Sequence, residues 1–309
     1  MPEHINMQDA QAALGFLIPQ TTYIERAINE IVYADIQYPA LIPIDTSAPD
    51  WSKSVTFYTA DKFGKAKWIN GNSDDVPRAG SELTKYESLI HTAGIGYGFG
   101  LEELSQAQML GVPLESMDAA AARRAYEEFV DGLLLRGDTV KGFSGLINNA
   151  GVTAVTAPTG NWAAATPAQI IADFNAMLMP TYAGTAYTSI ADTVLLPYER
   201  LQTLAQTLIP NTTEILLSFL LRQNVYTQTT GKPLTIRGVY GLLTAGAGST
   251  ARAVAYVKDP SVLKAHIPMP HRFLRPWQSG PLRWEIPGIF RVGGLDIRKP
   301  QSVRYLDGI

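Results

Sequence analysis

The apolar residues near the start of the chain recur with the spacing of one helical face. In residues 22–32 they stand three and four positions apart, which predicts an amphipathic helix. Pro39, Pro43 and Pro49 follow within a dozen residues. Because proline lacks a backbone N–H and fixes φ, this spacing disfavours both a helix and a central strand. The first fifty residues therefore predict an extended arm.

Two segments with alternating side chains predict a long β-hairpin. Residues 53–63 alternate well enough for one strand, and residues 83–100 can supply a longer return strand. The connection from Trp68 to Glu82 is polar and contains glycine and proline. A connection of this length is unusual inside a compact domain, and long loops are commonly functional. We expect a large exposed loop at the end of the hairpin.

The longest helical pattern lies between Pro113 and Arg136. Proline suits the first turn of a helix, and Gly137 stands where a left-handed residue commonly ends one. One face of the predicted helix is apolar, and its members are Ala122, Tyr126, Phe129, Val130 and Leu133. A glycine-punctuated segment, GDTVKGFSGLINNAG, follows the helix.

The second half of the chain alternates short helical and strand patterns. Thr166 followed by Pro167 marks a helix start, and the apolar face of that helix continues to Met179. The remaining predicted elements are a buried strand at 192–196, helices at 198–208 and 213–223, and strands near 234–243 and 252–258. Prolines separate short apolar segments in the last fifty residues, which predicts strands and turns. This alternation indicates an α/β or α+β fold.

Charge is distributed unevenly along a chain of 309 residues whose net charge is −3. The first fifty residues carry seven acids and one base, a net charge of −6, whereas residues 251–309 carry ten bases and four acids, a net charge of +6. The two ends are therefore expected to attract each other. Residues 151–250 hold only four acids and four bases, far below the usual charged fraction of about 25%. That segment is either mostly core or is covered by other subunits.

Composition excludes several classes of protein. The chain is 46% hydrophobic and 17% charged, which is typical of a folded protein and not of a disordered one. It has no cysteine, so thiolate nucleophiles, disulfides and cysteine-ligated metal sites are excluded. No apolar segment approaches the 18 or more residues of a membrane span, and the first residues do not form a secretion signal. We expect a soluble protein that makes no contact with a membrane.

Motifs for catalysis fail on their spacing. Neither Gly-Lys pair has the earlier glycine of a phosphate-binding loop, and the alternate glycines from Gly94 to Gly100 indicate a strand end, not a dinucleotide site. Ser144 lacks the context of a nucleophile elbow. His266 and His271 flank two prolines, which disfavours a shared metal. We therefore predict no catalytic residue, no cofactor site and no metal site.

Basic and aromatic side chains are interleaved near the C-terminal end. Arg272, Arg275 and Arg283 stand among phenylalanines and tryptophans, a combination that suits a phosphate backbone. The whole chain has a pI near 5.8, whereas nucleic-acid modules commonly exceed a pI of about 9. We therefore favour contact with protein over contact with nucleic acid.

The order of these parts resembles the HK97-type fold of tailed-phage major capsid proteins, over nearly the entire chain. The most similar residues are Gly137-Asp138 and the segment GFSGLIN at 142–148, just after the long helix. The terminal segment RVGGLDIRKP at 291–300 is similar to the end of a phage capsid family defined only as a domain of unknown function.

The resemblance implies an α+β fold with four parts. They are an N-terminal arm at 1–50, an extended hairpin loop at 51–100, a peripheral domain with a long spine helix at 101–165 and 260–309, and an axial α/β domain at 166–259. No charged coiled-coil extension precedes the arm, so we expect a separate scaffold protein or none.

The resemblance also implies a structural protein, not an enzyme, that self-assembles into the hexamers and pentamers of an icosahedral head around double-stranded DNA. The implied partners are further copies of the chain, separate scaffold, portal and decoration proteins, and packaged DNA through non-specific contact. The implied location is the virion capsid after assembly in the host cytoplasm. A bacterial encapsulin shell of the same fold is the alternative, and an α/β enzyme is the alternative from another class.

We expect contacts between subunits at the hairpin loop, the acidic arm and the basic C-terminal strands. The candidate residues are Trp68, Asn70, Asp74, Asp75, Arg78, Glu25, Glu30, Arg272, Arg275 and Arg283. Opposed charges favour an arm that lies across a neighbour's basic strands, because several weak surface pairs then act together. The competing interpretation is that the basic end faces packaged nucleic acid.

Overall fold

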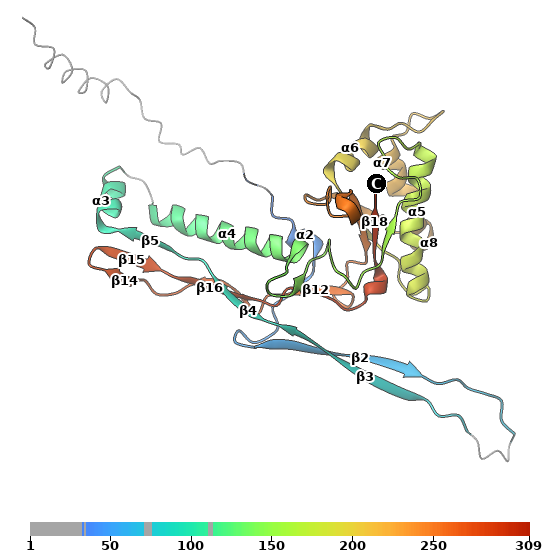
Figure 1. Cartoon of the computed structure of the whole chain (residues 1–309), viewed down its shortest axis with the longest axis horizontal. Helices are drawn as coiled ribbons and strands as arrows, with labels where there is room; N and C mark the ends of the chain where they lie inside the picture. Colours follow the sequence, from blue (N-terminus) through green and yellow to red (C-terminus); the bar gives the residue numbers. More distant parts are fainter. Residues whose placement is uncertain (1–32, 34, 71–75, 111–113) are drawn as a thin grey trace, which may run out of the picture. The chain divides into compact units, whose positions relative to one another are not determined.

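A computed structural model of the chain describes residues 33, 35–70, 76–110 and 114–309 (Figure 1). The chain separates into two units, residues 1–35 and residues 36–309, and the elements below all belong to the second unit. The helix predicted over 22–32 lies outside the described residues.

The proline-spaced segment begins with a one-turn helix, α2 (Tyr38–Leu41), and a short strand, β1 (Ile44–Asp45). The proline spacing disfavours a helix here, but Pro39 occupies the first turn of α2, where its missing N–H breaks no helical bond. Tyr38 and Leu41 are buried. This part of the predicted arm is therefore anchored in the core.

The predicted hairpin is confirmed as an isolated two-stranded sheet. Strand β2 (Ser54–Phe63) pairs antiparallel with β3 (Gly80–Leu89), from Ser54 opposite Leu89 to Phe63 opposite Gly80. The expected return strand to residue 100 is wrong, since β3 ends at Leu89. The residues after it form β4 (His91–Gly94) and β5 (Tyr97–Gly100), which join two other sheets.

Close packing of backbones explains the glycines in β4 and β5. A Cβ at Gly94 would lie 2.7 Å from the carbonyl oxygen of Gly288, and one at Gly98 would lie 2.8 Å from that of Trp284. These carbonyls belong to the partner strands β16 (Gly288–Val292) and β15 (Arg283–Ile286). Only glycine permits this approach.

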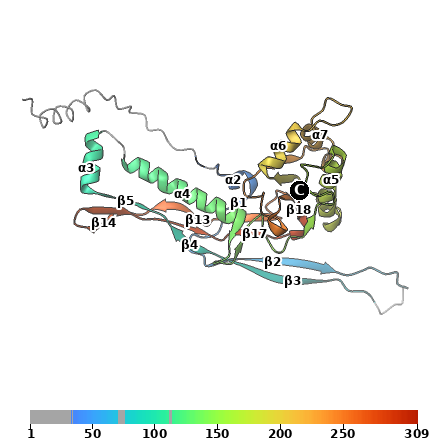
Figure 2. The same ribbon diagram turned by 45° about the horizontal axis from the view of Figure 1, so that its top comes forward.

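Three small sheets and the long helix make up one part of the unit (Figures 1 and 2). Their strand orders are β14 (Trp277–Gly280), β15, β5; β13 (Met269–Phe273), β16, β4; and β1, β12 (Leu263–His266), β17 (Leu295–Ile297). Helix α3 (Leu101–Leu110) follows β5, and α4 (Leu114–Arg136) runs along the sheets in both views.

Helix α4 confirms the predicted long helix and most of its apolar face. Ala122, Tyr126, Val130 and Leu133 are buried, whereas Phe129 on the same apolar face is 48% exposed. Its ring lies at the margin of the core, 5.6 Å from that of Phe290. After the helix, a left-handed Gly137 leads into the paired strands β6 (Gly137–Asp138) and β7 (Phe143–Ser144).

A five-stranded sheet forms the other part of the unit. Its order is β10 (Thr235–Gly238), β9 (Thr193–Leu196), β11 (Arg252–Tyr256), β18 (Val303–Asp307) and β8 (Ala154–Thr156). The helices of this part are α5 (Pro167–Gly184), α6 (Tyr198–Gln206), α7 (Leu216–Arg222) and α8 (Val225–Thr230). Two short 3-10 turns are η1 (Ala247–Ser249) and η2 (Pro300–Ser302).

Helix α5 begins as predicted, with a capping box between Thr166 and Gln169. It continues past the predicted end at Met179 to Gly184, with Pro180 inside it. Helix α8 was not predicted, and Asn224 caps it by accepting the N–H of Thr227 at 2.8 Å.

Two apolar cores stabilise the unit. One lies under α4 and joins α2, the small sheets and one face of the five-stranded sheet. The other lies between that sheet and α5 to α8 and includes Trp162, Phe174 and Leu220. Much of the weakly charged segment 151–250 therefore is core, although Tyr187 and Leu208 in it remain exposed.

Candidate assembly surfaces

The described residues contain little of what an active site needs. No group of three or more His, Asp or Glu residues among them is placed to hold a metal ion. Asp138 accepts the backbone N–H of Val140 at 2.8 Å, and Ser144 lies in β7, so both side chains belong to the turn after α4. Glu102 is exposed on α3. No described helix is both long and apolar enough to cross a membrane.

The base of the hairpin is fixed to the rest of the unit by a few specific contacts. The rings of Phe57 and Tyr86 stack at 5.2 Å, and the Arg298 guanidinium lies 4.5 Å from the centre of the Phe57 ring. The Ser88 hydroxyl donates to the carbonyl of Gly293 at 2.9 Å. These contacts hold only the pairs next to the base.

Beyond its base the hairpin exposes large apolar side chains on both faces. Tyr58 is 65% exposed and Leu83 is 66% exposed on one face, and Phe63 is 60% exposed on the other. A two-stranded ribbon has no core of its own and is marginally stable in water. Contiguous exposed apolar surface of this kind marks an interaction site. The hairpin is therefore a candidate interaction surface.

The candidate contact residues of the hairpin loop lie in solvent as far as the structure describes them. Trp68 is fully exposed, and Asn70 and Arg78 are exposed. Asp74 and Asp75 lie outside the described residues. An exposed tryptophan offers a large apolar area at low entropic cost, which is a common property of interface anchors.

The three candidate arginines lie on the small sheets at the end of the chain, and all are exposed. Arg272 pairs with Asp50 at 3.1 Å, and Arg283 lies 3.6 Å from Glu285. No described carboxylate pairs with Arg275. Trp277 and Leu282 are exposed near them, so this surface is both basic and apolar.

The expected attraction between the two ends is present inside one chain. Asp45 in β1 accepts a hydrogen bond from Lys264 in β12 at 2.5 Å. Burial raises the pKa of the Asp45 carboxyl, but hydrogen bonds from Lys264 and Ser47 outweigh it and hold the pKa well below its usual range. Glu25 and Glu30 lie outside the described residues.

His266, which sequence analysis did not assign to a metal, lies buried between two carboxylates. Its two ring nitrogens stand 3.6 Å from Asp45 and 3.6 Å from Asp296. His271 stacks on Tyr126 and its Nε2 lies 3.0 Å from the carbonyl oxygen of Ile95. Both histidines therefore belong to the packing of the small sheets.

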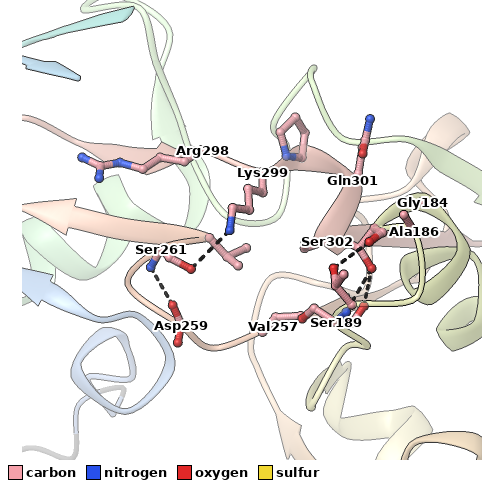
Figure 3. A pocket seen from close by; sticks show the side chains of 14 residues that line it. Gly184, Ala186, Ser189, Val257, Asp259, Ser261, Arg298, Lys299, Gln301 and Ser302 are labelled. Atoms are coloured by element: carbon pink, nitrogen blue, oxygen red, sulfur yellow. Dashed lines mark hydrogen bonds between the residues drawn. The ribbon is translucent and has the colours of Figure 1, made fainter. Parts of the chain in front are cut away.

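A cavity of about 760 Å³ was missed by sequence analysis (Figure 3). Its wall comes from three separate segments, 184–189, 257–262 and 298–302, so no local motif signals it. Two cations, Arg298 and Lys299, line it together with hydroxyl groups. The lining holds no arrangement of nucleophile and base, and it suits the binding of an acidic group.

The comparisons with known proteins agree with one another. A family model described as major capsid protein matches residues 64–309. The capsid of Myoviridae phage XM1 is similar over 94% of this chain and 98% of that chain, at 18% identity and a TM-score of 0.81. The capsid of a native GTA particle is similar over 98% and 99%, at 12% identity and a TM-score of 0.67. A chain of Mycobacterium phage Adephagia is similar over 99% and 98%, at 12% identity and a TM-score of 0.65. No curated protein matches.

Proposed function

The chain belongs to the major capsid protein family and is a structural protein of a phage capsid, and we propose how its copies assemble. They form hexamers and pentamers that close an icosahedral head around double-stranded DNA. The observation that carries the proposal is the hairpin, which exposes apolar side chains on both faces. Such a ribbon gains stability only when neighbours cover it. The α+β fold agrees with the capsid structures.

We assign the parts of the shell subunit as the resemblance implies. The arm is 1–50, the extended loop is 51–100, the peripheral domain is 101–165 with 260–309, and the axial domain is 166–259. The isolated hairpin and the long helix α4 support the second and third assignments. Strand β18 pairs with β11 of the axial range and β8 pairs with β18, so two strands from the ranges of the peripheral domain extend the sheet of the axial domain.

The proposed contacts between copies involve the exposed loop residues Trp68, Asn70 and Arg78. Arg275 is the candidate arginine that no described carboxylate neutralises. It is therefore the best placed to meet an acidic arm or the phosphates of packaged DNA. Separate scaffold, portal and decoration proteins are the further proposed partners, and assembly takes place in the host cytoplasm.

The subunit has no proposed catalytic role. Its family assignment is to a structural protein, and its charged side chains serve packing, turns and ion pairs. The encapsulin alternative is not favoured, because the family match over residues 64–309 is to major capsid proteins.

Negative-stain microscopy of the purified protein tests the proposal. Closed shells of uniform size, built from ring-shaped capsomers, are the expected result. A protein that stays monomeric or dimeric at high concentration, and also when its neighbouring genes are co-expressed, would contradict it.

A further inference from the structure

One face of the hairpin carries two carboxylates directly opposite each other. Asp61 in β2 is the register partner of Glu82 in β3, and both are exposed. Like charges directly opposite across an antiparallel pair destabilise it. Neither carboxylate forms an ion pair with a described residue. The same face bears Phe63, which is largely exposed. At its base this face is covered by Arg298 over Phe57, but around Asp61 and Glu82 it has neither a paired cation nor an apolar cover among the described residues.

The cavity of Figure 3 offers a cation that has no carboxylate partner of its own. The Lys299 Nζ lies 3.5 Å from the Ser261 hydroxyl and attracts the Asp259 carboxylate through space, but it forms no ion pair with a described carboxylate. Arg298 in the same wall is already held by Asp296 at 3.1 Å. Asp259, the acid in the lining, is bonded by the Ser261 hydroxyl and N–H, which hold the pKa of its carboxyl below the usual value.

Lys299 is one of the C-terminal bases that form no ion pair with a described carboxylate. Of the ten bases in residues 251–309, five pair with carboxylates of the same chain, namely Arg252, Lys264, Arg272, Arg283 and Arg298. Lys299 is exposed just before η2 and stands in the wall of the cavity of about 760 Å³. It combines an unpaired charge with room for an incoming group.

We propose that this cavity receives the Asp61–Glu82 face of the hairpin from a second copy of the chain. The ammonium of Lys299 lies between the two carboxylates, donates to both and removes their repulsion. The Phe63 ring packs against Val257 and Val262 of the lining. The inference rests on the proposed self-assembly and names the receiving surface.

Charge reversal and its repair test the contact. Lys299→Glu places three negative charges together, so we expect the yield of shells to fall about tenfold at about 0.1 M salt, where charges are screened little. Asp61→Lys with Glu82→Lys is expected to cause a similar loss. The three changes combined restore the opposite charges and are expected to recover most of the yield. Lys232→Glu, a reversal of an exposed lysine elsewhere, is the matched control and keeps the wild-type yield.

A disulfide provides an independent measurement, because the chain contains no cysteine. Asp61→Cys combined with Lys299→Cys is expected to link subunits into ladders on a non-reducing gel after mild oxidation of assembled particles. A monomer-sized band cross-linked within one chain overturns the assignment to a second copy. Absence of any cross-link in intact shells overturns the contact itself.

The outcomes separate this inference from the proposed function. Wild-type protein that forms no shells contradicts the proposed function. Shells that form normally with Lys299→Glu, or a combined variant that folds but recovers no yield, overturn the contact and leave the capsid role intact. Circular dichroism of the unassembled variants establishes that each is folded before its yield is compared.

Discussion

The five-stranded sheet and the hairpin are both built from β-strands, but they differ in where their stability comes from. Every residue of β9 and β11 is buried, whereas nearly all residues of β2 and β3 beyond the base are exposed. Side chains of the five-stranded sheet pack into both apolar cores of the unit. The hairpin has strands twice as long as most in the unit and no cover. One region has its core within the subunit, and we propose that neighbouring subunits cover the other.

Charges follow the same division. In the sheet, Arg252 binds Asp307 through two hydrogen bonds of 2.6 and 2.8 Å, and its guanidinium also lies 4.4 Å from the centre of the Tyr305 ring. In the hairpin, Asp61 and Glu82 face each other without a cation. The Arg252–Asp307 pair is therefore satisfied within the subunit, whereas Asp61 and Glu82 have no cation in the described part of the chain.

Removal of Arg252 is expected to destabilise the five-stranded sheet more than any other change proposed below. Arg252→Ala leaves the buried Asp307 carboxylate without its cation, which costs about 3–5 kcal/mol in comparable pairs. Urea unfolding of the unassembled subunit measures the loss. Arg222→Ala removes an exposed pair with Glu214 and is the control, with a loss of about 1 kcal/mol or less. Equal losses in the two variants would contradict this account.

Asp131 provides the next largest effect, because it ties the segment before β1 to α4. Its buried carboxylate accepts the N–H groups of Gln37 and Tyr38 at 2.9 and 2.8 Å, and also the Tyr240 hydroxyl. Asp131→Asn turns a donor toward these donors and is expected to cost about 1.5–3 kcal/mol. Hydrogen exchange should quicken at residues 36–42 more than in β9 and β11. Uniform quickening across the unit would argue against a local tie.

Acid should weaken the sheet more than the hairpin. Burial raises the pKa of Asp307, but hydrogen bonds from Arg252 and from the Ala247 N–H lower it by more, so its folded pKa lies below the ordinary value. Such a group stabilises the fold above its unfolded pKa of about 3.9, and this contribution is lost as pH falls through the folded pKa. Between pH 5 and pH 3, wild type should lose more unfolding free energy than Asp307→Asn. Equal losses of unfolding free energy in the two proteins would show that Asp307 does not cause the loss of stability in acid.

A change in the hairpin should have the smallest effect on the free subunit. Leu83→Ser removes an exposed side chain, so its unfolding free energy should change by about 0.5 kcal/mol or less. The yield of shells should nevertheless fall, because residue 83 no longer makes an apolar contact with the neighbouring subunit that covers the hairpin. Thr84→Ser is the control, because Thr84 follows Leu83 in β3 and its side chain lies on the other face of the hairpin. A large loss of subunit stability in Leu83→Ser would show that the hairpin has a core within its own chain.

Local sequence patterns predicted the elements whose signals are local. Thr166 with Gln169 caps α5, Gly137 follows α4 in the left-handed conformation, and the alternation in 53–63 becomes β2. The structural reading failed where the partner is distant in sequence. The segment 83–100 looks like one strand, but after Leu89 it leaves the hairpin for two other sheets, where its glycines meet the backbones of residues 284 and 288.

The assembly surfaces were predictable only in part. Trp68, Asn70 and Arg78 stand out because a polar loop with a tryptophan has no local reason to be buried. The pairing of Asp61 with Glu82 depends on the hairpin register, and the cavity around Lys299 depends on three segments that meet only in the fold. Neither leaves a spacing motif in the sequence.

The position of β18 has a consequence for the time at which the subunit is completed during protein synthesis. In the five-stranded sheet β8 has β18 as its single partner, and β18 also pairs with β11. Residue 156 therefore leaves the ribosome about 150 residues before its partner strand is made, which takes roughly 10–30 s at ordinary elongation rates. The sheet closes only after β18 has been synthesised. Truncated chains lack this closure, so an incomplete subunit does not present the finished surfaces on which a growing shell depends.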